Sequence, residues 1–239
     1  MVFGIKTDSK LNLERKIVIT ADGSSTIHLP DWDEQYHSKH GAIQEANHVF
    51  IKHGFNHYLS LYPDVKHPIS ILEIGFGTGL NAFITLLEAE KRQVAVDYTG
   101  VEGYPVGMDE INQLNYPTTL EVIDKAHIFR HLHELSWENN HMISSFFCLT
   151  KQKKFFSEIE EINTFNIIYF DAFGARVQPE LWTEAIFQKM YDALQPNGIL
   201  VTYAAKGSVR RAMQTVGFKV EKLPGPPGKR EMLRARKEV

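Results

Sequence analysis

From about Pro68 onward, short apolar runs alternate with segments of helical periodicity. The apolar runs predict strands at 69–74, 97–101, 144–149, 166–170 and 198–203, and helices are predicted at about 79–91, 153–162, 180–193 and 207–216. Such alternation is typical of βαβ units and a parallel sheet. Near the end, FKVEKL and EMLRAR flank the turn-rich PGPPGKR, which predicts an antiparallel hairpin at the sheet edge. The pattern therefore predicts an α/β fold with a seven-stranded, mostly parallel sheet whose last strand is antiparallel.

The segment before this alternation has a different pattern. The runs KIVIT and STIHL flank Asp22 and Gly23, a dipeptide that favours a tight reversal, so they predict a β-hairpin. Residues 42–61 carry apolar positions at helical spacing and predict an amphipathic helix. We therefore expect residues 1–67 to form an N-terminal hairpin and helix extension, and residues 68–239 to form the main domain.

Composition and charge narrow the class of protein. The 239 residues are 43% hydrophobic and 23% charged, as in an ordinary globular protein. No apolar signal segment and no run of about 18 apolar residues occurs, so we predict a cytoplasmic protein without a membrane partner. The net charge is −3, but residues 201–239 hold ten Lys or Arg against three Glu. This basic segment is either a docking face for a polyanion such as RNA or a solvated surface.

The strongest motif is ILEIGFGTGLN at 71–81, an apolar strand that leads through three glycines into a helix. Glycines there let backbone amides approach a ligand, and a helix N-terminus favours negative charge. The spacing is GxGxG because Leu80 stands where a dinucleotide site would have its third glycine. The motif therefore resembles motif I of S-adenosylmethionine enzymes; the alternative is a structural turn without a ligand. The predicted cofactor contacts are Glu73, Gly75, Gly77, Thr78 and Gly79.

Two further acids follow predicted strands. Glu102, in YTGVEGYP, is placed to accept hydrogen bonds from ribose hydroxyls, and Asp171, after NIIYF, is placed to position an acceptor beside the cofactor. Each could instead be a loop or capping carboxylate. Phe173, Pro179 and Trp182 can shape a pocket for a planar base, although each is equally compatible with plain packing.

Other polar residues carry weaker indications. Lys229 and Arg230 in the last turn are candidate phosphate or substrate contacts, or merely solubilising residues. Five histidines lie between positions 37 and 57 without Cys or Asp at ligand spacing, so we predict no metal site. These histidines are His37, His40, His48, His53 and His57.

Taken together, four segments make the sequence similar to the MnmC-like, or MnmD-type, methyltransferases. That family is the methyltransferase part of the bacterial enzyme that completes 5-methylaminomethyl-2-thiouridine at the tRNA wobble position. The segments cover nearly the whole chain in the family's order. They are DWDEQYHSKHGAIQEANHVFI, LEIGFGTGLNAF, DAFGARVQPELW and GFKVEKLPGPPGKREML.

The resemblance implies a Rossmann-like class I fold and S-adenosyl-L-methionine as cofactor. It implies methyl transfer to the primary amine of 5-aminomethyl-(2-thio)uridine at position 34 of tRNA, with tRNA as partner. It also implies that Asp171 lies at the reacting amine and that Glu45, Gly75, Gly77 and Glu102 contact the cofactor.

Two departures from the family pattern stand out. Where the family has a Gly-Asp pair near the adenine, this chain reads CLTKQKKF, which puts Thr150 and Lys151 in that place. Some relatives fuse the domain to a flavin-dependent oxidase, whereas this sequence ends at Val239, so we expect no fused oxidoreductase domain and methylation alone.

The residues leave rival functions open. A small-molecule amine methyltransferase or an aminopropyltransferase is compatible with the glycine loop, the ribose acid and Asp171. A non-enzymatic alternative is a module that keeps the fold and binds the cofactor or RNA without catalysis.

Overall fold

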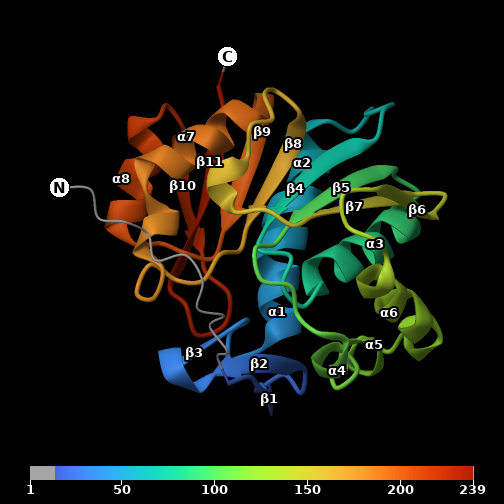
Figure 1. Ribbon diagram of the computed structural model, residues 1–239. Coiled ribbons are helices and arrows are strands. Elements are labelled where there is room, and N and C mark those ends of the chain that lie inside the picture. Colours follow the sequence, from blue (N-terminus) through green and yellow to red (C-terminus); the bar gives the residue numbers. More distant parts are fainter. Residues whose placement is uncertain (1–13, 239) are drawn as a thin grey trace.

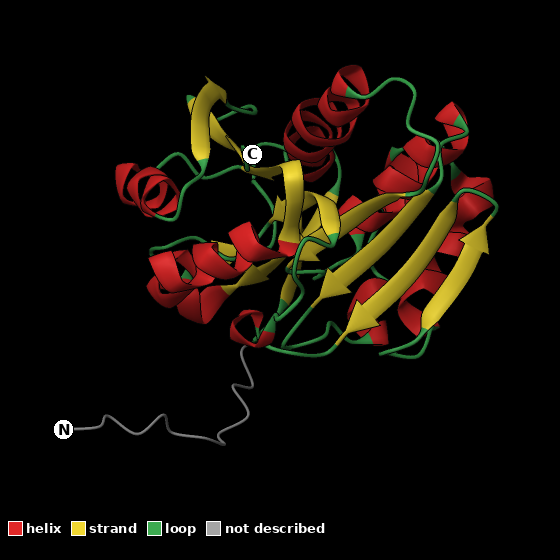
Figure 2. Cartoon of the chain, turned by 90° about the horizontal axis from the view of Figure 1, so that it is seen from above, coloured by secondary structure: helices red, strands yellow, loops and turns green. Residues whose placement is uncertain are grey.

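A computed structural model describes residues 14–238, and it shows a twisted central sheet with helices on both faces (Figure 1 and Figure 2). The described sheet has eight strands in the order β10-β11-β9-β8-β4-β5-β7-β6. The five central strands run parallel, which confirms the predicted α/β class. They are β4 (Ile69–Ile74), β5 (Val96–Val101), β7 (Phe147–Gln152), β8 (Phe165–Phe170) and β9 (Leu194–Thr202).

The outer strands are antiparallel. β10 (Lys219–Pro224) and β11 (Glu231–Arg236) form the predicted C-terminal hairpin, and β11 also pairs with β9. At the opposite edge, β6 (Asn140–Ser144) pairs with β7. The predicted number of seven strands is therefore wrong by one. The sequence of β6, NHMIS, contains no apolar run because no residue of this edge strand is fully buried.

The region around β7 differs from the prediction in two ways. The strand begins three residues later than the apolar run at 144–149. The predicted helix at 153–162 is wrong, since the chain forms only a short 3₁₀ turn there, η4 (Phe156–Glu158). Its apolar residues do not make a helical stripe: Ile159 is buried, whereas Phe155 and Ile162 are exposed. The segment that follows β7 is therefore an irregular loop.

Helices cover the two faces of the sheet and give each its own hydrophobic core. α3 (Leu80–Arg92) and α6 (Ala126–Glu134) pack on one face, and α7 (Glu184–Ala193) and α8 (Gly207–Thr215) pack on the other. Neighbouring residues of β4 point to opposite cores, as strand geometry requires, with Ile71 in one and Leu72 in the other. Shorter helical segments are α4 (Met108–Ile111), α5 (Tyr116–Thr119), η3 (Ile123–Lys125) and η5 (Pro179–Trp182).

The predicted N-terminal hairpin is present and gains a third strand. β1 (Lys16–Ile19) pairs with β2 (Ser25–Leu29), and β2 pairs with β3 (Glu34–Gln35), with the turn η1 (Pro30–Trp32) between β2 and β3. The predicted helix follows as three continuous segments. These are α1 (Ala42–Ala46), the π-helical η2 (Asn47–Phe55) and α2 (Asn56–Leu61). Residues 1–13 of the predicted extension lie outside the described residues.

The helix formed by α1, η2 and α2 shares a core with the sheet. Phe50 and Phe55 are fully buried in the same cluster as Tyr169 of β8, and the rings of Phe50 and Tyr169 lie 5.1 Å apart. A Cβ atom at Gly54 would lie 3.1 Å from the Tyr169 ring, so glycine allows this close approach. A domain boundary between residues 67 and 68 stays a prediction.

The parallel strands place three predicted site residues at one edge of the sheet. β4, β5 and β8 end just before Gly75, Glu102 and Asp171, and ligands of such folds bind beyond these strand ends. Among residues 14–238, no helix combines the length and the apolar character needed to cross a membrane.

Because Phe55 is 0% exposed in the shared core, we expect Phe55→Ala to lower the free energy of unfolding by about 3–5 kcal/mol. Denaturant unfolding followed by circular dichroism measures this loss. Leu61→Ala, on the same helix but 39% exposed, is the control and should have little effect. Equal effects of the two substitutions would show that the helix does not share the core of the sheet.

Candidate functional site

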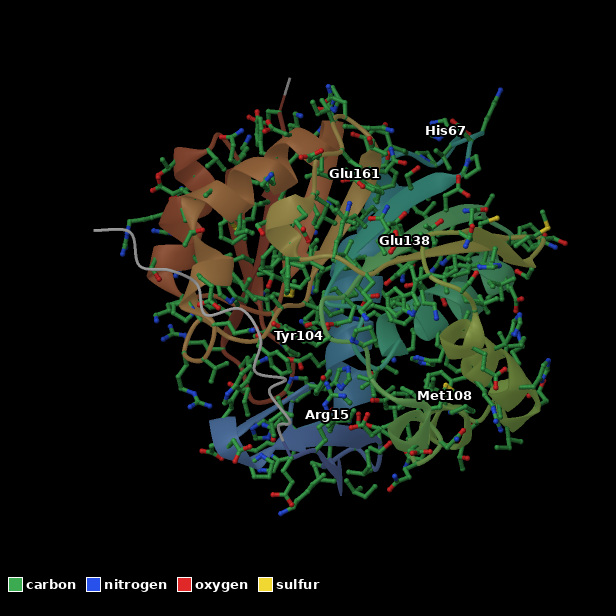
Figure 3. All side chains as sticks on the ribbon, in the orientation of Figure 1. Arg15, His67, Tyr104, Met108, Glu138 and Glu161 are labelled. Carbon is green, nitrogen blue, oxygen red and sulfur yellow. The ribbon has the colours of Figure 1, made fainter. Side chains whose placement is uncertain are left out.

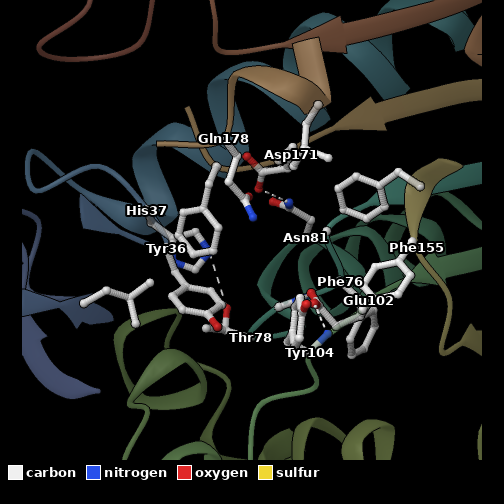
Figure 4. A pocket seen from close by; sticks show the side chains of 18 of the residues that line it. Tyr36, His37, Phe76, Thr78, Asn81, Glu102, Tyr104, Phe155, Asp171 and Gln178 are labelled. Atoms are coloured by element: carbon white, nitrogen blue, oxygen red, sulfur yellow. Dashed lines mark hydrogen bonds between the residues drawn. The ribbon is translucent and has the colours of Figure 1, made fainter. Parts of the chain in front are cut away.

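A cavity of about 550 Å³ lies at this edge of the sheet, a volume within the usual range for small-molecule sites. Its walls come from the N-terminal sheet, the glycine loop, and the segments that follow β5, β7 and β8. Figure 4 shows Asp171 and Asn81 on one side of the cavity and Glu102 on another. The lining residues used below are Arg15, Trp32, Tyr36, His37, Gly75, Phe76, Gly77, Thr78, Asn81, Glu102, Tyr104, Phe155, Asp171 and Phe173.

The glycine loop after β4 brings backbone to the cavity wall. Gly75 has φ +91° and Gly77 has φ +47°, conformations that favour glycine. A Cβ atom on Gly75 would lie 2.8 Å from the carbonyl oxygen of Asp171, and one on Gly77 would lie 3.1 Å from the Tyr36 ring. Gly75, Gly77 and Thr78 line the cavity, whereas Gly79 precedes α3 and does not. Glycine therefore allows the loop to pass close to Asp171 and Tyr36.

Glu102 follows β5 and is fixed by two backbone amides. Its Oε2 accepts a hydrogen bond from the N–H of Gly77 at 3.0 Å, and its Oε1 accepts one from the N–H of Tyr104 at 2.8 Å. Burial raises the pKa of Glu102, and these amides oppose the rise. Because a carboxylate has about four acceptor sites, Glu102 can still accept donors from a ligand in the cavity.

Aromatic rings form the wall next to Glu102. Tyr104 and Phe155 are 57% and 52% exposed, and their ring centroids lie 5.8 Å apart in an edge-to-face arrangement. Phe76, in the glycine loop, lines the same part of the cavity (Figure 4). Arg15 and Tyr104 lie near each other between the N-terminal sheet and the main sheet, as Figure 3 shows, and an Arg15 nitrogen lies 3.4 Å from the Tyr104 carbonyl oxygen.

Thr150 and Lys151 stand where the family has its Gly-Asp pair, and the sequence left the adenine contact open at this place. Both residues lie within β7, and neither lines the cavity. Lys151 is buried, its ammonium donates to the carbonyl oxygen of His133 at 2.7 Å, and burial lowers its pKa to about 8. Because β7 runs three residues further than predicted, Phe155 takes the place beside the cavity.

Asp171 lies directly after β8 with its carboxyl group in the cavity (Figure 4). Its Oδ2 accepts a hydrogen bond from Nδ2 of Asn81 at 2.8 Å. Burial raises the pKa of Asp171 to about 7, with a further contribution from the charge of Glu45; the Asn81 hydrogen bond and Lys229 oppose the rise. An acid with this pKa can exchange a proton near neutral pH.

Glu45 and Lys229 form an ion pair behind Asp171. Glu45 lies on α1, and its Oε1 accepts a hydrogen bond from the Lys229 ammonium, while its Oε2 accepts one from the N–H of Ser38 at 2.8 Å. The Lys229 nitrogen also lies 3.8 Å from the ring centroid of Tyr203. Neither Glu45 nor Lys229 lines the large cavity. Both act on Asp171 through charge rather than by direct contact.

Glu73, a predicted cofactor contact, is fully buried in β4 and does not line the cavity. Of the predicted substrate residues, Phe173 lines the cavity, but Trp182 is buried and donates its indole N–H to the Phe173 carbonyl oxygen at 2.8 Å. Pro179 does not line the cavity either. Trp182 therefore supports the wall rather than forming it.

Lys229 and Arg230 line a second cavity, of about 470 Å³, next to the first. The segment after β8 lies between the two cavities, since Phe173 lines the first and Gly174 lines the second. Arg176 and Lys206 also contribute, so the charged lining residues of the second cavity are basic except for Glu231.

Several lining residues were not predicted. Asn81 is the last residue of the motif at 71–81. Its place in the first turn of the predicted helix could have indicated that its polar side chain faces the site. Tyr36 and His37 lie in DWDEQYHSKH of the N-terminal segment, and only their position within a family segment could have indicated them. No group of three or more metal-binding side chains occurs within residues 14–238.

Comparison with known proteins finds one matching family model and a similar curated protein. Residues 128–238 match the family model described as S-adenosyl-L-methionine-dependent methyltransferase. The bifunctional tRNA 5-methylaminomethyl-2-thiouridine biosynthesis protein MnmC of Hydrogenovibrio crunogenus is 26% identical over 211 residues. That alignment covers 84% of this chain but 31% of the relative, so the chain spans about a third of its length.

Two solved structures share the fold. MNMC2 from Aquifex aeolicus has a TM-score of 0.75 at 23% identity, covering 96% of this chain and 72% of that one. A spermidine synthase in complex with the transition state analogue AdoDATO has a TM-score of 0.51 at 15% identity, covering 95% and 74%. At these identities the likeness concerns the fold alone.

The fold is Rossmann-like, and the family match over residues 128–238 makes the chain similar to S-adenosyl-L-methionine-dependent methyltransferases. The chain is also similar to the bifunctional protein MnmC and shares the fold of MNMC2, so the resemblance predicted from the sequence is confirmed.

We expect Glu102→Ala to weaken S-adenosyl-L-methionine binding by about tenfold or more, because hydrogen bonds from the cofactor to its carboxyl group would be lost. Isothermal titration calorimetry measures the affinity. Asp97→Ala is the matched control, since Asp97 is an exposed acid on the same strand. Unchanged affinity of the Glu102 variant would exclude this carboxylate from the cofactor site.

Proposed function

We propose that the protein methylates the primary amine of 5-aminomethyl-(2-thio)uridine at wobble position 34 of tRNA, with S-adenosyl-L-methionine as methyl donor. The observation that carries the proposal is the carboxyl group of Asp171, which shares one cavity with the glycine loop and Glu102. The MnmC relative is named for the biosynthesis of 5-methylaminomethyl-2-thiouridine in tRNA, which supports this choice of acceptor.

The residues at one end of the cavity suit the cofactor. The backbone of Gly75 and Gly77 lines the cavity, and Glu102 offers acceptor oxygens for ribose hydroxyls. We propose that Tyr104 and Phe155 pack against the adenine, because planar rings interact favourably with such side chains. Glu45 and Glu73 are assigned to the surroundings of Asp171, since neither lines the cavity.

When bound, S-adenosyl-L-methionine supplies a methyl group on a positively charged sulfur, and the amine nitrogen bonds to this carbon as the carbon–sulfur bond breaks. The nitrogen must reach this step as a neutral amine and has one proton in excess afterwards. Asp171 orients the amine and accepts that proton. Its pKa of about 7 makes it a stronger base than an ordinary aspartate while leaving a large ionised fraction at neutral pH.

The target base has an aromatic wall available on the other side of Asp171. Phe173 lies edge-to-face with Trp32 at 5.8 Å and with Tyr36 at 4.9 Å, and all three line the cavity. We propose that the uracil ring packs there. A wobble base lies in a single-stranded loop, where such stacking is a common mode of recognition.

The second cavity suits the RNA backbone. Lys229 is held by Glu45, so of the two basic residues predicted to contact substrate we propose Arg230 for a phosphate, together with Lys206. These residues belong to the basic segment 201–239. The cavity lies next to the proposed base site, as a backbone that carries a base would require.

The central test incubates the protein with methyl-labelled S-adenosyl-L-methionine and tRNA that carries 5-aminomethyluridine or its 2-thio form. Nucleoside digestion and mass spectrometry should find the label in 5-methylaminomethyl-(2-thio)uridine. Polyamines and other small amines serve as competing acceptors. Label in these amines alone, or cofactor binding without any transfer, would replace the proposed function with a rival one.

We expect Asp171→Asn to lower kcat by at least about 100-fold, because a positioned base contributes roughly that much. Cofactor affinity should stay close to that of the native protein. In the native protein, kcat/KM should fall as the pH falls through about 7, since Asp171 becomes protonated below its pKa. Native-like turnover of the variant would remove Asp171 from the mechanism.

We expect Arg230→Gln to weaken tRNA binding and to reduce the slope of log K against log salt concentration by about 1, as loss of one phosphate contact does. Filter binding at several salt concentrations measures the slope. Lys91→Gln is the control, since Lys91 is an exposed cation in the last turn of α3 and lines neither cavity. Equal slopes for both variants would place the RNA backbone elsewhere.

A further inference from the structure

The side-chain amide of Asn81, the second residue of α3, lies between the carboxyl groups of buried Glu73 and partly buried Asp171. Its Nδ2 lies 2.9 Å from Oε1 of Glu73 and 2.8 Å from Oδ2 of Asp171. Figure 4 shows the link to Asp171 as a dashed line. An amide nitrogen carries two hydrogens, so each carboxyl group receives one. The two acids are thus joined through a single side chain.

Glu73 is the more enclosed of the two acids. It is 0% exposed, and its Oε2 has no hydrogen-bond partner among the described residues. Burial raises the pKa of Glu73 well above its ordinary value; Asn81 opposes the rise and the charge of Asp171 adds to it. A carboxylate with an unpartnered oxygen is strongly disfavoured in such an interior, so burial favours the neutral form of Glu73.

Asp171 differs from Glu73 in that it lines the cavity. Its Oδ2 is occupied by Asn81, whereas its Oδ1 accepts no hydrogen bond from any residue between 14 and 238. Oδ1 is therefore the oxygen available to a molecule in the cavity.

We propose that Asn81 is a positioning residue that holds Asp171 by Oδ2 against a neutral Glu73, so that Oδ1 receives the amine of the acceptor. The inference rests on the proposed role of Asp171 at that amine. Neutral Glu73 anchors the Asn81 amide by accepting a hydrogen bond without placing a second negative charge beside Asp171. An amide is suited to this place because, unlike a hydroxyl, it donates to both acids at once.

The amide also affects the protonation of Asp171. A hydrogen bond donated to a carboxylate favours its ionised form, so loss of Asn81 raises the pKa of Asp171 further above its ordinary value. The other groups that influence or adjoin Asp171 come from α1, β4, β5, the segment after β9 and the β10–β11 turn. They are Glu45, Glu73, Tyr98, Tyr203 and Lys229.

The first experiment compares Asn81→Ala with the native protein. We expect the acidic limb of the pH profile of kcat/KM to move up by about one pH unit. At pH values below the pKa of Asp171, kcat/KM should then be about tenfold lower than in the native protein. Asn166→Ala is the matched control. Asn166 is a buried asparagine in β8 whose side chain is hydrogen-bonded to Ser70 and Gln195 and not to Asp171. A general loss of packing would lower activity in both variants without moving the limb.

The second experiment is Glu73→Gln, an uncharged residue of the same shape. The Gln side-chain oxygen can accept the Asn81 hydrogen bond as the neutral acid does, so the acidic limb should stay at its native position. If Glu73 carries a charge in the native protein, this substitution removes it and moves the limb to lower pH. That shift, or an unmoved limb in Asn81→Ala, overturns the proposal.

An infrared titration of the protein without substrate separates this inference from the proposed function. The carboxyl band of Asp171, assigned by its loss in Asp171→Asn, should titrate at higher pH in Asn81→Ala than in the native protein. If this shift occurs but tRNA is not methylated, the Asn81 link stands and the acceptor assignment fails. If Asn81→Ala does not fold, Asn81→Ser replaces it, since one hydroxyl hydrogen cannot serve both acids.

Discussion

The close approach of the glycine loop to the segment after β8 is the constraint on which the rest of the site depends. A Cβ atom at Gly75 would lie 2.8 Å from the carbonyl oxygen of Asp171, so any other residue there would push the two segments apart. The N–H of Asp171 in turn donates to the carbonyl oxygen of Ile74 at 2.9 Å, which continues the pairing of β4 with β8 beyond their ends. Sheet pairing thus carries the acid to the loop that suits a cofactor.

The N-terminal sheet completes this arrangement from outside the doubly wound core. His37 lies 3.1 Å from the Thr26 hydroxyl and 3.3 Å from the Thr78 hydroxyl, so it joins the sheet to the glycine loop. Burial lowers the pKa of His37 to about 4, which keeps the ring neutral and able both to donate and to accept. Because Tyr36 also lines the cavity, the extension forms part of the site wall.

The sequence predicted what depends on local pattern. Gly75, Glu102 and Asp171 could be placed because each follows an apolar run, and parallel strands bring such positions to one edge. Strand β6 was missed because a polar edge strand lacks the apolar run by which buried strands are predicted.

What depends on the direction of a side chain could not be predicted. Glu73 and Trp182 have the chemistry of site residues, yet both are buried beside the cavity rather than in its wall. Phe155 became a wall residue because β7 extends beyond its apolar run, and Asn81 because α3 begins directly at the glycine loop. The positions of Phe155 and Asn81 in the cavity wall depend on tertiary contacts, which the hydrophobic pattern of the sequence does not reveal.

As the proposed base, Asp171 must satisfy two opposing requirements, and its pKa is set by burial together with groups from other segments. An ordinary aspartate is too weak a base, whereas a fully desolvated one would stay protonated at neutral pH. Glu45, from the extension, raises the pKa of Asp171, while Asn81 and Lys229, from α3 and the C-terminal hairpin, lower it. Because Lys229 pairs with Glu45, removal of either residue also frees the charge of the other. The N-terminal extension and the final hairpin are therefore coupled at one carboxyl group, which explains why a doubly wound core alone would not set its basicity.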